Sequence, residues 1–155
     1  MGGGEEMDWI AYFDDFFSKR AAKLAEMMKA AGCREGWVQG ELFLHGRDLG
    51  IETNATRLKY DILCKSAPMI AEIKICGGDY SPKMKGLIED DVRKLGRDPG
   101  DRERFMILIV DTRKADSKLA DWLRDPGFSD LKLDRKFSES VAIKVWQVKT
   151  GAQQQ

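Results

Sequence analysis

Hydrophobic residues recur at helical spacing along the N-terminal part of the chain. This spacing predicts a long amphipathic helix over residues 8–31, which Gly32 ends. Its apolar stripe consists of Trp9, Ile10, Phe13, Phe16, Phe17, Leu24, Met27, Met28 and Ala31. We expect this stripe to pack into the core, and the alternative is an interface with a second copy or a protein partner. A second helix is predicted over residues 34–49.

Shorter apolar runs predict a set of strands in the rest of the chain. Strands are expected over residues 51–56, 58–64 and 69–76, and residues 65–68 form the turn between the last two. A helix is then predicted over residues 81–96, a buried strand over 105–110, a short helix over 114–123 and a last strand over 141–148. The order α-α-β-β-β-α-β-α-β predicts an α/β fold, in which a mixed sheet is flanked by helices.

The length of 155 residues fits a single domain, and no pattern marks a boundary between two units. Within it we expect the N-terminal helix (8–31), a core over residues 34–149 and a disordered tail over residues 150–155. The three cysteines, Cys33, Cys64 and Cys76, lack the spacing of a zinc site or a disulfide framework. No segment resembles a signal peptide or a membrane span, so the sequence favours a cytoplasmic protein without membrane contact.

Charge is high but balanced, with 26 basic and 26 acidic residues. A nucleic-acid surface would therefore depend on local segregation of charge and not on a basic composition. Lys83, Lys85 and Lys94 follow the strand predicted over residues 69–76 and could contact backbone phosphates. The alternative for these lysines is an ordinary solvated helix face.

Charged residues interrupt two of the predicted strands, where apolar side chains are expected. Asp61 lies in the first, and Glu72 and Lys74 lie in the second. If the two strands pair through the turn at residues 65–68, Asp61 lies opposite Glu72, at about 5 Å, on the face that also carries Lys74. Two carboxylates this close repel each other unless a cation lies between them, and a hard divalent ion is the natural occupant. The alternative is that all three simply face solvent.

One more carboxylate and the only histidine lie on the helix predicted over residues 34–49. Glu41 comes four residues after Trp37 and three before Leu44, so it is expected to point into the apolar sector of that helix. Either the helix phase is misassigned or this carboxylate is aimed at a site. His45 is expected to be a satisfied, partly buried histidine, with support of the site as the alternative.

A helix glutamate, a β-meander with Asp61 and Glu-x-Lys, a further helix and another strand together resemble the PD-(D/E)XK nuclease superfamily, which has the restriction-endonuclease-like fold. The resemblance runs from about residue 41 to residue 110. It implies that Asp61, Glu72, the carbonyl of Ile73 and the helix residue Glu41 bind Mg²⁺, with Mn²⁺ as a substitute. It also implies that Lys74 orients the attacking water or stabilises the charged transition state.

The chain departs from the family pattern at two places. Tyr60 stands where a proline often precedes the aspartate, at a position that varies within the family. No Gln-x-x-x-Tyr signature follows Lys74, which disfavours the exonuclease-like subgroups.

The resemblance implies Mg²⁺-dependent hydrolysis of phosphodiesters by an endonuclease that acts on DNA. A chain this small would need a homodimer or a protein partner for a double-strand cut, and the N-terminal helix is the candidate contact. The alternative is a catalytically inactive, nuclease-fold binding or immunity-type protein. The neutral charge and the acidic run Glu89, Asp90 and Asp91 favour that alternative. The complete set of Asp61, Glu72 and Lys74 argues against it, because buried charges that serve no purpose destabilise a fold.

Overall fold

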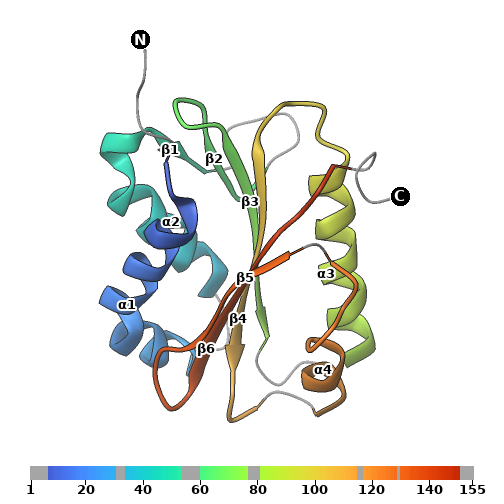
Figure 1. Cartoon of the computed structure of the whole chain (residues 1–155). Coiled ribbons are helices and arrows are strands. Elements are labelled where there is room, and N and C mark those ends of the chain that lie inside the picture. Colours follow the sequence, from blue (N-terminus) through green and yellow to red (C-terminus); the bar gives the residue numbers. More distant parts are fainter. Residues whose placement is uncertain are drawn as a thin grey trace.

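A six-stranded mixed sheet lies between two layers of helices in the computed structural model (Figure 1), which describes residues 7–30, 34–53, 60–76, 81–114, 117–128 and 130–150. The strands are β1 (Ile51–Glu52), β2 (Ile62–Cys64), β3 (Met69–Cys76), β4 (Glu103–Asp111), β5 (Asp130–Lys136) and β6 (Val141–Gln147), in the spatial order β1-β2-β3-β4-β6-β5. The helices are α1 (Trp9–Met27), α2 (Arg34–His45), the 3-10 turn η1 (Arg47–Leu49), α3 (Ser81–Gly96) and α4 (Ser117–Trp122). The predicted α/β class with a helix-flanked mixed sheet is confirmed.

Helix α1 begins at an N-cap, where the Asp8 side chain accepts a hydrogen bond from the Ala11 N–H at 3.0 Å. Its aromatic stripe is buried against the sheet: Trp9, Tyr12, Phe13, Phe16 and Phe17. Core packing of this stripe is therefore confirmed. Contact with a second copy or a partner through α1 stays a prediction for the remaining surface of the helix.

Strands β3 and β4 run parallel and are joined through α3, as parallel neighbours require. Their side chains alternate between two cores. Ala71, Ile73 and Ile75 of β3 pack with α1 and α2. Glu72 and Lys74 therefore lie on the opposite face, toward α3.

The predicted register of β2 and β3 is confirmed. Ile62 pairs with Ala71, Leu63 with Ile70 and Cys64 with Met69 in an antiparallel ladder. Asp61 directly precedes β2, so continuing this register brings it opposite Glu72.

Strand β5 was not expected from the sequence. Six of its seven residues are exposed, and its sequence DLKLDRK places charges at most positions. Among the described strands it pairs with β6 alone, at the edge of the sheet. Its two apolar residues, Leu131 and Leu133, give too short an alternation to identify a strand. Strand β1 ends at Glu52, and a bend follows at Thr53, within the strand predicted over residues 51–56.

Several predicted features lie outside the described residues. These are the end of the first predicted helix at residues 31–32, Cys33, residues 115–116 of the predicted short helix and residues 151–155 of the predicted tail. Residues 54–59, at the end of the first predicted strand and the start of the second, also lie outside. Within the described ranges, no helix is both long enough and apolar enough to cross a bilayer.

Candidate acidic site beside β3

Strand β3 extends beyond its neighbour β2, and among the described residues no strand pairs with this further part of its edge. The ladder with β2 covers Met69 to Ala71, whereas β3 continues to Cys76. Carboxylates bind the N–H groups beyond the ladder. Asp61 Oδ2 accepts from the Ile73 N–H at 2.8 Å, and Glu35 Oε1 of α2 accepts from the Ile75 N–H at 3.2 Å. Acidic side chains thus replace the missing strand along this edge.

Asp61 and Glu72 lie side by side and are linked by a hydrogen bond, as the register predicted. The Asp61 N–H donates to Glu72 Oε2 at 2.9 Å, while the Asp61 side chain accepts from the residue after Glu72. Gln39 of α2 fixes the other aspartate oxygen, because its Nε2 donates to Oδ1 at 3.0 Å. The two carboxylates therefore face the same small volume.

Helix α3 contributes one charge of each sign to the site. Asp91 Oδ2 lies 3.2 Å from Lys74 Nζ, and Lys94 Nζ donates to Glu72 Oε1. Asp91 and Lys94 are three residues apart and so lie on one face of α3. We call the group formed by Glu35, Gln39, Asp61, Glu72, Lys74, Asp91 and Lys94 the acidic site.

Glu72 is buried beside a second carboxylate, that of Asp61. Only 3% of this residue is exposed. Burial is the main cause that raises the pKa of Glu72 from 4.5 to about 7, and repulsion by Asp61 adds to it. The hydrogen bonds from Lys94 and from the Asp61 N–H oppose the rise without cancelling it.

The other charged groups of the site respond to the same surroundings. Burial raises the pKa of Glu35 and that of Asp91, and Lys74 opposes both shifts. Burial alone would lower the pKa of Lys74, but Asp91 and Glu35 outweigh it and the pKa is raised. Lys74 is therefore a firmly protonated cation at one end of the acidic site.

Glu41 does not join the acidic site, contrary to the expectation from the sequence. Its carboxylate lies 3.9 Å from Arg20 Nε of α1. The helix phase inferred from the sequence was wrong, because Val38 and Leu42 form the buried side of α2 while Leu44 is 58% exposed. Glu35 and Gln39, one turn apart on α2, are the residues that reach Asp61 and β3. Their spacing of four was the signal in the sequence that could have identified this face.

His45 is a partly buried histidine with partners of its own, as expected. Its Nε2 lies 3.6 Å from Asp15 Oδ2, and its Nδ1 lies 3.5 Å from Arg20. Burial and the neighbouring Arg20 lower the pKa of His45.

The three lysines predicted to contact phosphates have different surroundings. Lys94 binds Glu72, and the exposed Lys85 has its Nζ 5.4 Å from the centre of the Trp122 ring. Lys83 is exposed on α3.

The donor chemistry of the site fits Mg²⁺ only in part. Asp61 and Glu72 supply oxygens, and Mg²⁺ is commonly held by one or two carboxylates together with water and substrate phosphates. The Ile73 N–H points toward Asp61, so the Ile73 carbonyl lies along the same edge of β3. However, all four oxygens of the pair already accept a hydrogen bond, and each would have to use its second lone pair or release a donor. Within the described ranges, no group of three or more His, Cys, Asp or Glu side chains is arranged to hold a metal ion.

No protein-family model, curated protein or solved structure matches this chain. Its function is therefore inferred from the geometry and charges of the acidic site.

Proposed function

We propose that this chain is a metal-dependent nuclease of the PD-(D/E)XK type, which hydrolyses phosphodiester bonds of DNA with Mg²⁺, or Mn²⁺ in its place. The observation that carries the proposal is the placement of Asp61 beside Glu72, with Lys74 on the same face of β3. The Asp61 N–H donates to the Glu72 carboxylate, and the Asp61 carboxylate accepts from the Ile73 N–H. The acidic site has four carboxylates, those of Glu35, Asp61, Glu72 and Asp91, against the two ammonium groups of Lys74 and Lys94. Burial is the main cause that raises the pKa of Glu72 to about 7, and repulsion by Asp61 adds to it. A divalent cation would remove this excess.

The order of elements supports the proposal. Helix α2, the meander β1 to β3, helix α3 and strand β4 follow one another as in the restriction-endonuclease-like fold. The charged residues lie at the corresponding places, with Asp61 directly before β2 and with Glu72 and Lys74 on β3.

Five residues of the acidic site have a chemical role in this proposal: Asp61, Glu72, Lys74, Asp91 and Glu35. Asp61, Glu72 and the Ile73 carbonyl would hold the metal ion, which supplies a more acidic water and shields the leaving oxygen. Lys74 keeps its proton, since its pKa is raised by Asp91 and Glu35 against the effect of burial. It can therefore stabilise negative charge that develops on the phosphate. Asp91 orients this ammonium group.

Glu35 takes the role first expected of Glu41. It is the α2 carboxylate that binds the β3 edge, and burial raises its pKa. From this position it can orient a water molecule or a metal-bound ligand beside Lys74.

Cleavage assays with two variants test the proposal. Plasmid and single-stranded DNA are incubated with the wild type in Mg²⁺ or Mn²⁺, beside Glu72→Ala and the control Glu26→Ala, which alters a 74% exposed glutamate of α1. We expect metal-dependent cleavage that Glu72→Ala lowers at least about a hundredfold, the scale of losing one catalytic electrostatic contact. Cleavage that persists unchanged in Glu72→Ala would contradict the assignment of the site.

A second function is favoured by one feature of the site. The carboxylates of Asp61 and Glu35 accept from N–H groups along the edge of β3, a task that needs no catalysis. The same scaffold could therefore serve an inactive, nuclease-fold binding or immunity-type protein. Absence of both metal binding and cleavage in the wild type would favour this function over hydrolysis.

A further inference from the structure

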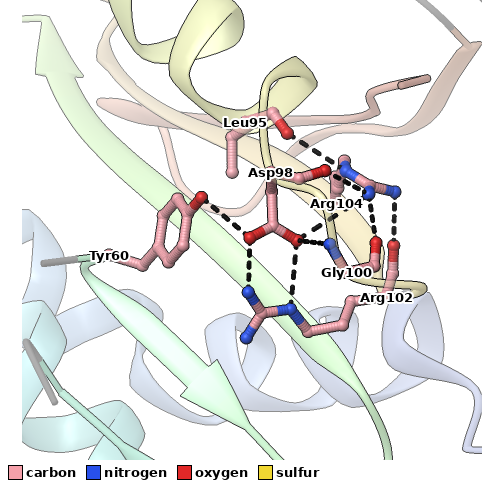
Figure 2. A network of polar contacts seen from close by, with 6 residues as sticks. All are labelled: Tyr60, Leu95, Asp98, Gly100, Arg102 and Arg104. Carbon is pink, nitrogen blue, oxygen red and sulfur yellow. Dashed lines mark hydrogen bonds and ion pairs between the residues drawn. The ribbon is translucent and has the colours of Figure 1, made fainter. Parts of the chain in front are cut away.

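A second buried polar network lies beside the acidic site, around Asp98 in the loop between α3 and β4 (Figure 2). The Asp98 side chain is fully buried. Its carboxylate accepts from the Tyr60 hydroxyl at 3.1 Å, from Arg102 Nε at 3.1 Å and from the Gly100 N–H at 3.2 Å. A second guanidinium nitrogen of Arg102 also binds it.

Arg104 fixes the loop that carries this aspartate. Its guanidinium donates to the carbonyl oxygens of Leu95 at 3.0 Å, Arg102 at 2.7 Å and Asp98 at 3.0 Å, and also to that of Gly100. The loop is thus closed around one buried cation (Figure 2). Asp98 is consequently a fixed acceptor and not a mobile loop residue.

Tyr60 connects this network to the acidic site in two ways. It is the residue directly before Asp61, and it is only 1% exposed. Its ring also lies beside Lys94, whose Nζ is 5.1 Å from the ring centre and binds Glu72. Tyr60 therefore contacts Lys94, which binds Glu72, and directly precedes Asp61 in the chain.

Strand pairing holds Asp61 from one side only, because the ladder between β2 and β3 begins at the next residue, Ile62. Among the described residues, Asp61 itself is held by the Glu72 carboxylate, by the Ile73 N–H and by Gln39. On its other side in the chain, the contact that the structure describes is the hydrogen bond from the Tyr60 hydroxyl to Asp98.

We propose that Tyr60, held by Asp98, is a positioning residue that sets the separation and orientation of Asp61 and Glu72. The inference rests on the proposed function for its catalytic meaning, while its structural content concerns the pair alone. The hydroxyl fixes the backbone before Asp61, and the ring fixes Lys94 over Glu72. Small displacements matter here, because misplacing a reacting group by about 1 Å can lower a rate on the order of a hundredfold.

Amide hydrogen exchange of Tyr60→Phe tests this positioning without any metal or substrate. The variant removes only the hydroxyl and keeps the buried ring. The informative groups are the Asp61 N–H and the Ile73 N–H, because each donates to a carboxylate of the pair. We expect both to exchange about tenfold faster, the effect of losing one hydrogen bond of ordinary strength, while the Ile107 N–H at the centre of β4 changes less.

Tyr12→Phe is the matched control. Tyr12 is also buried, and its hydroxyl donates to the Leu42 carbonyl at 3.4 Å in the core on the other face of the sheet. Both variants lose one buried hydroxyl, so general loosening would affect Asp61 and Ile73 alike in both. Unchanged exchange at these two amides in Tyr60→Phe, or an equal change in Tyr12→Phe, would overturn the inference.

Mn²⁺ titration separates this inference from the proposed function. If the wild type binds Mn²⁺, we expect Tyr60→Phe to bind it about three- to tenfold more weakly and Tyr12→Phe to bind it as the wild type does. A wild type that neither binds Mn²⁺ nor cleaves DNA refutes the proposed function, and the exchange rates still decide whether Tyr60 positions the pair.

Discussion

Two buried carboxylates, Asp98 and Glu72, lie in opposite charge surroundings. They are connected through Tyr60, whose hydroxyl binds Asp98, and through Lys94, which lies over the Tyr60 ring and binds Glu72. Asp98 is bound by Arg102 and lies 3.7 Å from a guanidinium nitrogen of Arg104, so one negative charge meets two positive ones. Glu72 shares its surroundings with Asp61, so two negative charges meet the ammonium of Lys94. The first arrangement fixes a loop. The second retains excess negative charge, which destabilises the fold and attracts a cation.

The largest expected effect comes from Asp98→Ala, because it leaves the buried Arg104 and the partly buried Arg102 without their anion. Breaking a buried pair by removing one partner typically costs about 3–5 kcal/mol. We therefore expect a loss of this order in the free energy of unfolding, measured by urea denaturation at pH 7. A loss below about 1 kcal/mol would mean that the network contributes little to stability.

Glu72→Gln tests the second carboxylate of the comparison, because it removes one negative charge from the pair formed by Asp61 and Glu72. The wild-type pKa of Glu72 is raised by burial and by Asp61 to about 7, against 4.5 for an ordinary glutamate. The folded state therefore binds the proton more tightly, and the resulting stability is full below pH 4.5 and is lost as the pH rises to about 7. Glu72→Gln has no titrating group at this position, so it does not lose stability in this way as the pH rises.

The measurement is the difference in unfolding free energy between Glu72→Gln and the wild type as a function of pH. We expect this difference to shift in favour of the variant by on the order of 1–3 kcal/mol from about pH 4.5 to pH 7. A constant difference over this range would show that Glu72 is already neutralised by its neighbours.

The sequence predicted much of this arrangement because the relevant signals are local. The apolar runs and the turn at residues 65–68 were enough to predict the register that brings Asp61 opposite Glu72. The helix over residues 81–96 and the buried strand β4 also followed from apolar spacing and from glycine and proline signals.

The rest depends on contacts that local patterns do not contain. The phase of α2 was set by its packing against α1 and the sheet, which exposes Leu44 and turns Glu41 to Arg20. Glu35 is part of the site because β3 extends beyond the end of its pairing with β2. No single residue in the sequence indicates this difference in strand length. Asp98 and Arg102 lie in residues 96–102, where glycine, proline and polar residues indicate only a loop, and Arg104 directly precedes the strand predicted over residues 105–110.

A pair of substitutions on α2 tests which carboxylate belongs to the acidic site. We expect Glu35→Gln to lower metal-dependent cleavage about tenfold, because it neutralises a group beside Lys74 and weakens the bond to the Ile75 N–H. Glu41→Gln should retain cleavage within about twofold, since its carboxylate faces Arg20. The reverse pattern would support the helix phase first inferred from the sequence.

The smallest effect is expected outside both carboxylate networks, at Lys83 and Lys85. If these exposed lysines contact phosphates, the double variant Lys83→Ala/Lys85→Ala should weaken DNA binding several-fold and reduce the salt dependence of the binding constant by about one to two ions. Fluorescence anisotropy at several salt concentrations measures the slope of the logarithm of the binding constant against the logarithm of the salt concentration. An unchanged slope would assign both lysines to an ordinary solvated face.

Calorimetric titration with Mn²⁺ at pH 7.5 tests most directly whether the unbalanced pair is a metal site. We predict that the wild type and the control Glu26→Gln bind one ion or two, and that Asp61→Asn/Glu72→Gln binds at least about tenfold more weakly. Binding by the double variant as tight as that of the wild type, or no binding by the wild type, would contradict a metal site at Asp61 and Glu72.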